Sequence, residues 1–216
     1  MTEQPNAALF KAWLLRSASG SWLAISAELV GCYALGTNEQ EALNGLAAAI
    51  PAFYYWLSQH DEYTPTLSGP IRVEALGTYD LGPGVENIFL ADDNVPINDE
   101  DLDWLLSVLN WAYDDLLRDA RQRADTPARE DLLNHTAARQ AHFISLALDI
   151  APPNFTGSGL ERVAAARAAA LQMFRHSNQT QREAIREVGG QRWSLRSGLR
   201  ASVLLARRVN QSVAAL

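Results

Sequence analysis

Residues 31–43 read GCYALGTNEQEAL, a stretch that joins a predicted strand to a predicted helix. The short apolar run at 32–35 predicts the strand, and the Gly-Thr-Asn after it leads into a glutamate-rich helix start. Asn38 is a suitable N-cap, and Glu41 follows three residues later, where the partner of a capping box belongs. The segment therefore predicts a strand followed by a helix over residues 39–60.

Further strands are predicted on both sides of this segment. Residues 10–15 and 22–25 are apolar and partly aromatic, and the SASG between them indicates a hairpin turn. Two later stretches, 71–79 and 85–90, also read as strands and are joined by a turn containing LGPG. We expect a small antiparallel sheet with one helix.

The predicted helix carries a proline and a run of aromatic residues. Pro51 should kink the helix or divide it in two. Directly after it come Phe53, Tyr54, Tyr55 and Trp56. Four consecutive helical positions cannot all face one core, because each is turned by about 100° from the last. We expect some of the four to form an inter-domain or dimer interface, in preference to a ligand pocket.

From residue 92 onward the pattern is helical. A first helix begins with Asn98 or Asp99 as its cap and continues with apolar residues at i, i+3, i+4 and i+7 spacing. These residues are Leu102, Leu105, Leu106, Leu109, Tyr113, Leu116 and Leu117. A second helix is predicted from Thr126-Pro127 to about residue 149 and a third over 160–176.

The last part of the chain predicts a turn and a fourth helix. IREVGGQRW indicates a tight Gly-Gly turn between two extended pieces, and Ser194 caps a helix that runs almost to the C-terminus. Four helices of this length favour an up-and-down bundle with one longer connection. The chain is thus expected to be α+β, with domains at 1–94 and 95–216.

Composition narrows the function classes. Residues 1–103 contain 15 acidic and 3 basic residues, which argues against nucleic-acid binding there. Cys32 is the only cysteine, so an intramolecular disulfide and a cysteine zinc site are excluded. No apolar run approaches the roughly 18 residues of a membrane span, and the N-terminus does not read as a signal peptide. We expect a cytoplasmic protein.

The segment AELVGCYALGTNEQEAL resembles the core of the HicB-like antitoxin fold, whose pattern is roughly Pro-Asp-Leu-Pro-Gly-Cys, then Gly-Asp-Thr and Glu-Glu-Ala. The matching positions are Gly31, Cys32, Gly36, Glu41 and Ala42. Both prolines and the aspartate of the pattern are replaced, by Ala27, Val30 and Glu28. The resemblance implies a small sheet packed on a helix, often dimeric, that contacts other proteins.

Residues 99–216 resemble the DinB/YfiT-like four-helix bundles. LLNHTAARQAHF is similar to the family's second helix, and QRWSLRSGLR to the opening of its last helix. Many members bind a divalent metal through one histidine of the second helix and a His-x-x-x-His pair in the last. Some use the metal for thiol-dependent transfer or isomerisation, and many have no known reaction.

The metal ligands of that family are incomplete in this chain. His135 matches the ligand of the second helix, but Leu205 and Val209 occupy the two positions of the last helix. No His, Asp, Glu or Cys follows Glu187, so a shift of register supplies no ligand. We expect no metal and no cofactor.

A rebuilt metal site would need His135, His142 and His176. Arg139 shares the face of the first two, and a guanidinium repels a divalent cation. The simpler interpretation is that His135 forms a hydrogen bond inside the bundle.

A cavity is expected where the metal site would lie. One helix supplies His135, Arg139 and His142, and another supplies Tyr113 or Trp111. Because Arg139 offers a planar donor fork, the expected ligand is a small anion.

A basic ridge lies on the last helix, where Arg192, Arg196 and Arg200 recur every four residues. Contact with nucleic acid or another anion is one interpretation. Pairing with the acidic first domain or with acids on the bundle is the simpler one.

The sequence favours a non-catalytic binding or structural protein. Its expected partners are a second copy of the chain, a small molecule or another protein, without nucleic acid or membrane. One alternative is a diverged DinB-like metal-dependent transferase or hydrolase. A second is an antitoxin-like regulator that binds a toxin or an operator.

Overall fold

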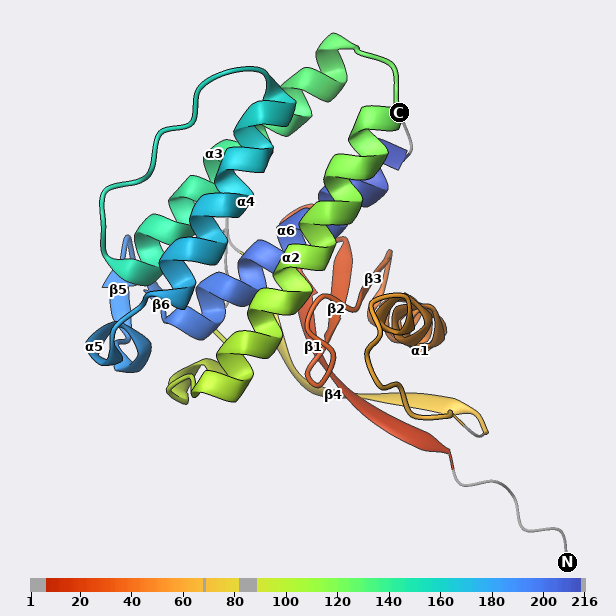
Figure 1. Cartoon of the computed structure of the whole chain (residues 1–216). Helices are drawn as coiled ribbons and strands as arrows, with labels where there is room; N and C mark the ends of the chain where they lie inside the picture. The colour runs from red at the N-terminus through yellow and green to blue at the C-terminus, as the bar shows by residue number, and fades with distance from the viewer. Residues whose placement is uncertain (1–6, 68, 82–88, 215–216) are drawn as a thin grey trace, which may run out of the picture. The chain divides into compact units, whose positions relative to one another are not determined.

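The computed structural model describes residues 7–67, 69–81 and 89–214 (Figure 1). The chain divides into two compact units, Met1–Glu86 and Asn87–Leu216. The first contains a four-stranded sheet and one helix, and the second contains helices and a small hairpin, which confirms the α+β class. The division expected after residue 94 lies inside the second unit, because the 3-10 turn η1 (Ala91–Asn94) packs against the last helix.

The sheet of the first unit has the strand order β3-β2-β1-β4. Its strands are β1 (Ala8–Arg16), β2 (Trp22–Ser26), β3 (Tyr33–Gly36) and β4 (Ile71–Asp80). The β1–β2 and β2–β3 pairs are antiparallel, as predicted, but β4 runs parallel to β1. A helix connects β3 to β4, and such a crossover returns the chain in the same direction. The strand predicted at 85–90 falls mostly outside the described residues, and positions 89 and 90 are not in a strand.

Helix α1 (Glu39–Ser58) begins where the sequence predicts. The Asn38 side chain accepts the Glu41 N–H at 2.9 Å. The Glu41 carboxylate accepts two hydrogen bonds from Thr37, from its N–H at 2.8 Å and its hydroxyl at 2.5 Å. These bonds satisfy donors that would otherwise be left unpaired at the helix start.

Pro51 does not divide α1, so that part of the prediction is wrong. A proline inside a helix costs about 3 kcal/mol. Leu46 and Ile50 before it and Phe53 after it are all buried, and their burial holds the helix together across the proline.

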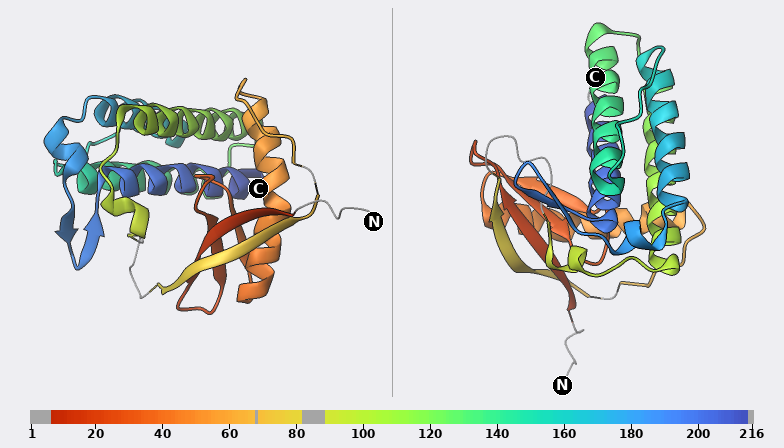
Figure 2. Two further views of the ribbon diagram at one scale, coloured as in Figure 1. Left: turned by 90° about the horizontal axis from the view of Figure 1, so that it is seen from below. Right: turned by 90° about the vertical axis from the view of Figure 1, so that its left-hand side faces the viewer.

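α1 covers one face of the sheet (Figure 2). A Cβ on Gly45 would lie 3.1 Å from the Ala34 side chain, and the rings of Tyr54 and Phe10 are 6.3 Å apart. Ala34 lies across the sheet from Leu14 through Ala24, so these residues share the face under α1. The hydrophobic core of the first unit lies between α1 and this face of the sheet.

The second unit contains the four predicted long helices. They are α2 (Asp99–Gln122), α3 (Pro127–Leu148), α4 (Gly159–Arg175) and α6 (Leu195–Ala214). The side chains of Asn98, Thr126 and Ser158 cap the first three, each accepting a backbone N–H three residues later. The short helix α5 (Gln179–Glu183) was not predicted, because one turn gives no periodic pattern.

The predicted Gly-Gly turn is confirmed. It joins β5 (Arg186–Val188) to β6 (Gln191–Trp193), which pair as an antiparallel hairpin. Gly189 and Gly190 have φ values of 59° and 77°, as a two-residue hairpin turn requires.

The helices of the bundle do not alternate strictly in direction. α2 and α3 each pack against both α4 and α6, so they lie diagonally opposite each other. The longer connection is at residues 149–158, and it runs back along the bundle so that α3 and α4 point the same way (Figure 1). Among the described residues, no helix combines the length and apolar character needed to cross a membrane.

Candidate functional site

The predicted ligand residues of α3 lie on its outer side. His135 and His142 are exposed and Arg139 is half-buried. The core side of α3 is formed by Leu133, Ala137, Gln140 and Ile144, which are buried. The prediction that His135 forms a hydrogen bond inside the bundle is therefore wrong.

Tyr113 belongs to a different environment from these residues. It is fully buried on α2, and its hydroxyl donates a 2.8 Å hydrogen bond to Gln140 Oε1 of α3. The Gln140 amide donates to Ser202 Oγ of α6 at 2.9 Å, and Ser202 donates to the Gly198 carbonyl at 2.8 Å. Burial raises the pKa of Tyr113 far above its ordinary value, so the phenol is a neutral donor.

We call this series of hydrogen bonds the central polar network. It consists of Tyr113, Gln140, Ser202 and the Gly198 carbonyl. It links three helices, and each of its side-chain donors named above has an acceptor. Sequence reasoning missed Gln140 and Ser202. Their signal was a polar residue at a core position of a helical stripe, which predicts a partner on a facing helix.

Trp111 lies apart from the central polar network. It is half-buried on α2, and its ring meets that of Trp104 edge-on at 6.0 Å. Tyr113 points into the core while His135 and His142 point outward, so the expected cavity between them is not assembled.

Leu205 and Val209, which the resemblance predicted at the metal positions of the last helix, take part in apolar packing. Leu205 is half-buried against a cluster of Phe143, Trp193 and Ala201, and Val209 is buried. His176 is the C-cap of α4, with Nδ1 3.0 Å from the Gln172 carbonyl oxygen. Within the described ranges, no three His, Cys, Asp or Glu side chains are grouped so that they could hold a metal ion.

The basic ridge of the last helix pairs with acids and an amide of its own unit. Arg196 contacts Asp101 at 2.5 Å, and Arg200 contacts both carboxylate oxygens of Asp93 at 2.5 and 2.6 Å. Arg192, just before the helix, donates to Asn94 at 2.9 Å. Pairing with acids of the bundle is therefore confirmed for Arg196 and Arg200, whereas Arg192 bonds to an amide oxygen.

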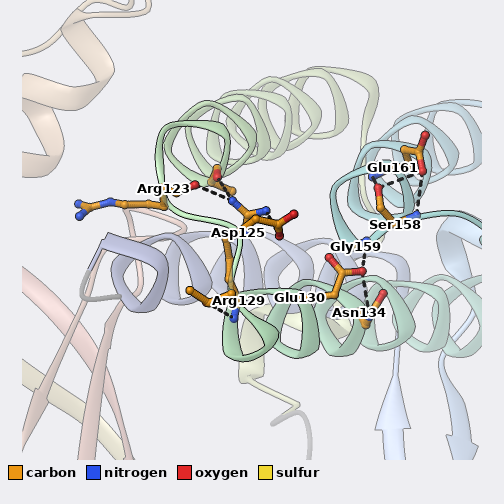
Figure 3. Close-up of polar contacts among 10 residues, drawn as sticks. Arg123, Asp125, Arg129, Glu130, Asn134, Ser158, Gly159 and Glu161 are labelled. Carbon is orange, nitrogen blue, oxygen red and sulfur yellow. Dashed lines mark hydrogen bonds and ion pairs between the residues drawn. The ribbon is translucent and has the colours of Figure 1, made fainter.

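A second polar cluster closes the turn between α2 and α3 (Figure 3). Arg129 is buried, and its Nη1 donates to the carbonyls of Ala120 and Arg123 at 3.0 and 2.7 Å. Its Nη2 donates to Asp125 at 2.7 Å. The guanidinium thus satisfies carbonyls at the end of α2, where a cation also complements the helix dipole.

Beside this turn, α3 supplies a carboxylate to the start of α4 (Figure 3). Glu130 Oε1 accepts the Gly159 N–H at 2.6 Å. Ser158 and Glu161 form a capping box at the same helix start, and the Ser158 hydrogen bonds lower the pKa of Glu161. These contacts are structural, because each joins a side chain to a helix terminus.

The four aromatic residues of α1 are placed differently from one another. Phe53 is buried in the core, Tyr54 contacts Phe10, and the Trp56 ring is 5.2 Å from that of Phe53. Tyr55 is 68% exposed. An interface on this part of α1 would therefore be centred on Tyr55.

Arg139 is the predicted site residue with the most unusual surroundings. Its guanidinium carbon lies 5.4 Å from the centroid of the Phe143 ring, and its Nε is enclosed without an acceptor. No described residue forms a hydrogen bond or ion pair with this guanidinium.

No family model, curated protein or solved structure matches this chain.

Proposed function

We propose that the chain is a non-catalytic cytoplasmic binding or structural protein, with a HicB-like first unit and a DinB-like bundle. It would hold a small anionic ligand or a protein partner. The observation that carries this proposal is the central polar network, in which the Tyr113 hydroxyl, the Gln140 amide and the Ser202 hydroxyl each donate to an acceptor within the protein.

Catalysis by a nucleophile needs a hydroxyl or thiol beside a base. Ser202 instead accepts from Gln140 and donates to the Gly198 carbonyl. Ser194 and Ser197 bond to each other at the start of α6, where they satisfy backbone groups. These buried hydroxyls support helix ends and helix packing.

The metal-dependent alternative lacks a set of ligands in the described part of the chain. Leu205 packs against Phe143 and Trp193 at one of the positions where that alternative needs a ligand, and an aliphatic side chain cannot coordinate a metal. Both observations favour the non-catalytic proposal.

Metal analysis of protein purified without a histidine tag tests the proposal. We expect zinc and nickel far below one equivalent, and the same low content in His135→Ala. One equivalent of either metal in the parent protein, lost in His135→Ala, would overturn the proposal and favour the metal-dependent alternative. His60→Ala is the control, because His60 lies in the first unit and belongs to neither set of predicted ligands.

A further inference from the structure

Arg139 differs from seven other shielded arginines of the bundle in having no acceptor among the described residues. Among the half-buried and buried arginines described, those that donate to a carbonyl, amide oxygen or carboxylate are Arg129, Arg162, Arg167, Arg182, Arg186, Arg196 and Arg200. Within the described residues, Arg139 instead has a ring contact with Phe143 and no such hydrogen bond. A guanidinium remains charged at any physiological pH, so its donors favour an external acceptor.

The Phe143 ring fixes the position of this guanidinium. A cation over an aromatic face is attracted by the ring quadrupole, and the 5.4 Å separation is within the range of that interaction. The ring is itself held rigidly, because Phe143 is 2% exposed and packs on Trp193 with ring centroids 5.8 Å apart. Arg139 is therefore preorganised without using its hydrogen-bond donors.

Apolar side chains continue from the same ring. Leu146 of α3 and Leu205 of α6 are half-buried and pack on the cluster that contains Phe143. A ligand whose charge meets Arg139 could extend its carbon chain over these two leucines.

The charges of the two helices also favour an anion. Residues 135–148 of α3 and 195–214 of α6 contain no aspartate or glutamate. Arg208 is exposed on α6, and His135 and His142 are exposed on α3. α6 thus carries no carboxylate, and those of α3, Glu130 and Asp131, lie near its start, outside the segment that carries the cluster.

We propose that Arg139, Phe143, Leu146 and Leu205 form a binding site for a carboxylate carried on an apolar chain. The Arg139 guanidinium donates two parallel N–H hydrogen bonds to the two carboxylate oxygens of the ligand. The two leucines cover the ligand's apolar carbon chain. This inference rests on the proposed binding function and names the class of ligand.

Hexanoate is the probe that tests the site, with acetate and hexanol as partial probes. Each is titrated into the full chain labelled with ¹⁵N, and the Arg139 Nε–H and Trp193 indole N–H resonances are followed. We expect hexanoate to shift both signals and to saturate, with acetate and hexanol each binding at least about tenfold more weakly.

Arg139→Gln should weaken hexanoate binding by about tenfold or more, since it removes a charged bidentate donor. Arg139→Lys should also weaken it, because lysine keeps the charge and loses the fork. Arg175→Gln, an exposed arginine of α4, is the matched control and should leave the affinity unchanged.

Two results would overturn the inference. One is the absence of saturable shifts up to tens of millimolar hexanoate, and the other is equal affinity in the parent protein and Arg139→Gln. Neither result changes the metal content, so failure of this site and failure of the non-catalytic proposal are distinguishable.

Discussion

At the scale of single residues, the same side-chain type has different roles according to what it contacts. Arg129 satisfies the carbonyls at the end of α2, whereas Arg139 has no acceptor among the described residues and lies against an aromatic ring. Gly198 shows how close the packing is, because a Cβ there would lie 2.5 Å from the Ala147 side chain. Such contacts between α6 and α3 require the small residue.

Glu41 gives a pH-dependent contribution to stability. The Thr37 hydroxyl and then its N–H lower the pKa of Glu41 from its ordinary 4.5. Because the folded pKa is lower than the unfolded one, the stabilisation is present above pH 4.5 and is lost as the pH falls through the folded pKa.

We therefore expect Glu41→Gln to lower the free energy of unfolding at pH 7, by an amount that shrinks as the pH falls below 4.5. Urea unfolding from pH 7 to pH 3 measures the difference. Glu39→Gln is the control for loss of a first-turn charge. A difference between parent and Glu41→Gln that stays constant across this range would contradict the account.

At the scale of elements, the end of one helix is stabilised by a side chain of another. α4 starts after a long connection, and its first N–H groups are satisfied both by its own capping box and by Glu130 of α3. The carboxylate also complements the positive end of the helix dipole. This contact fixes where α4 begins against α3.

Glu130→Ala should destabilise the protein by about 1 kcal/mol or more, because the Gly159 N–H loses a charged acceptor. Hydrogen exchange at Gly159 should accelerate in this variant by more than at the middle of α4. Asp131→Ala removes the neighbouring exposed carboxylate and is the matched control. Equal effects of the two substitutions would show that Glu130 does not cap α4.

At the scale of the whole molecule, the sequence predicted the long helices and most strands, because caps and apolar periods are local signals. The parallel β1–β4 pair and the shared direction of α3 and α4 depend on contacts far apart in the chain, which no local pattern contains.

The candidate site was predicted in part. The spacing of His135, Arg139 and His142 correctly put them on one side of α3, but spacing does not say which side meets the core. The opposite side, which meets the core, carries Ala137 and Gln140. Because one is small and the other polar, this side is little more hydrophobic than the outer side, and the sequence pattern did not identify it as the core face.

The claim at the centre of this account is that the central polar network stabilises the bundle and takes no part in chemistry. A residue kept for a reaction commonly costs stability, and its replacement is neutral or stabilising. Removal of a buried structural donor instead lowers the stability. Without the Tyr113 hydroxyl, Gln140 Oε1 would lose its hydrogen-bond donor in the core.

Urea unfolding of Tyr113→Phe tests this claim most directly, with Tyr55→Phe as the control for an exposed hydroxyl. We predict that Tyr113→Phe lowers the free energy of unfolding by about 1–3 kcal/mol while Tyr55→Phe leaves it within about 0.5 kcal/mol. A Tyr113→Phe variant as stable as the parent protein, or more stable, would contradict the account.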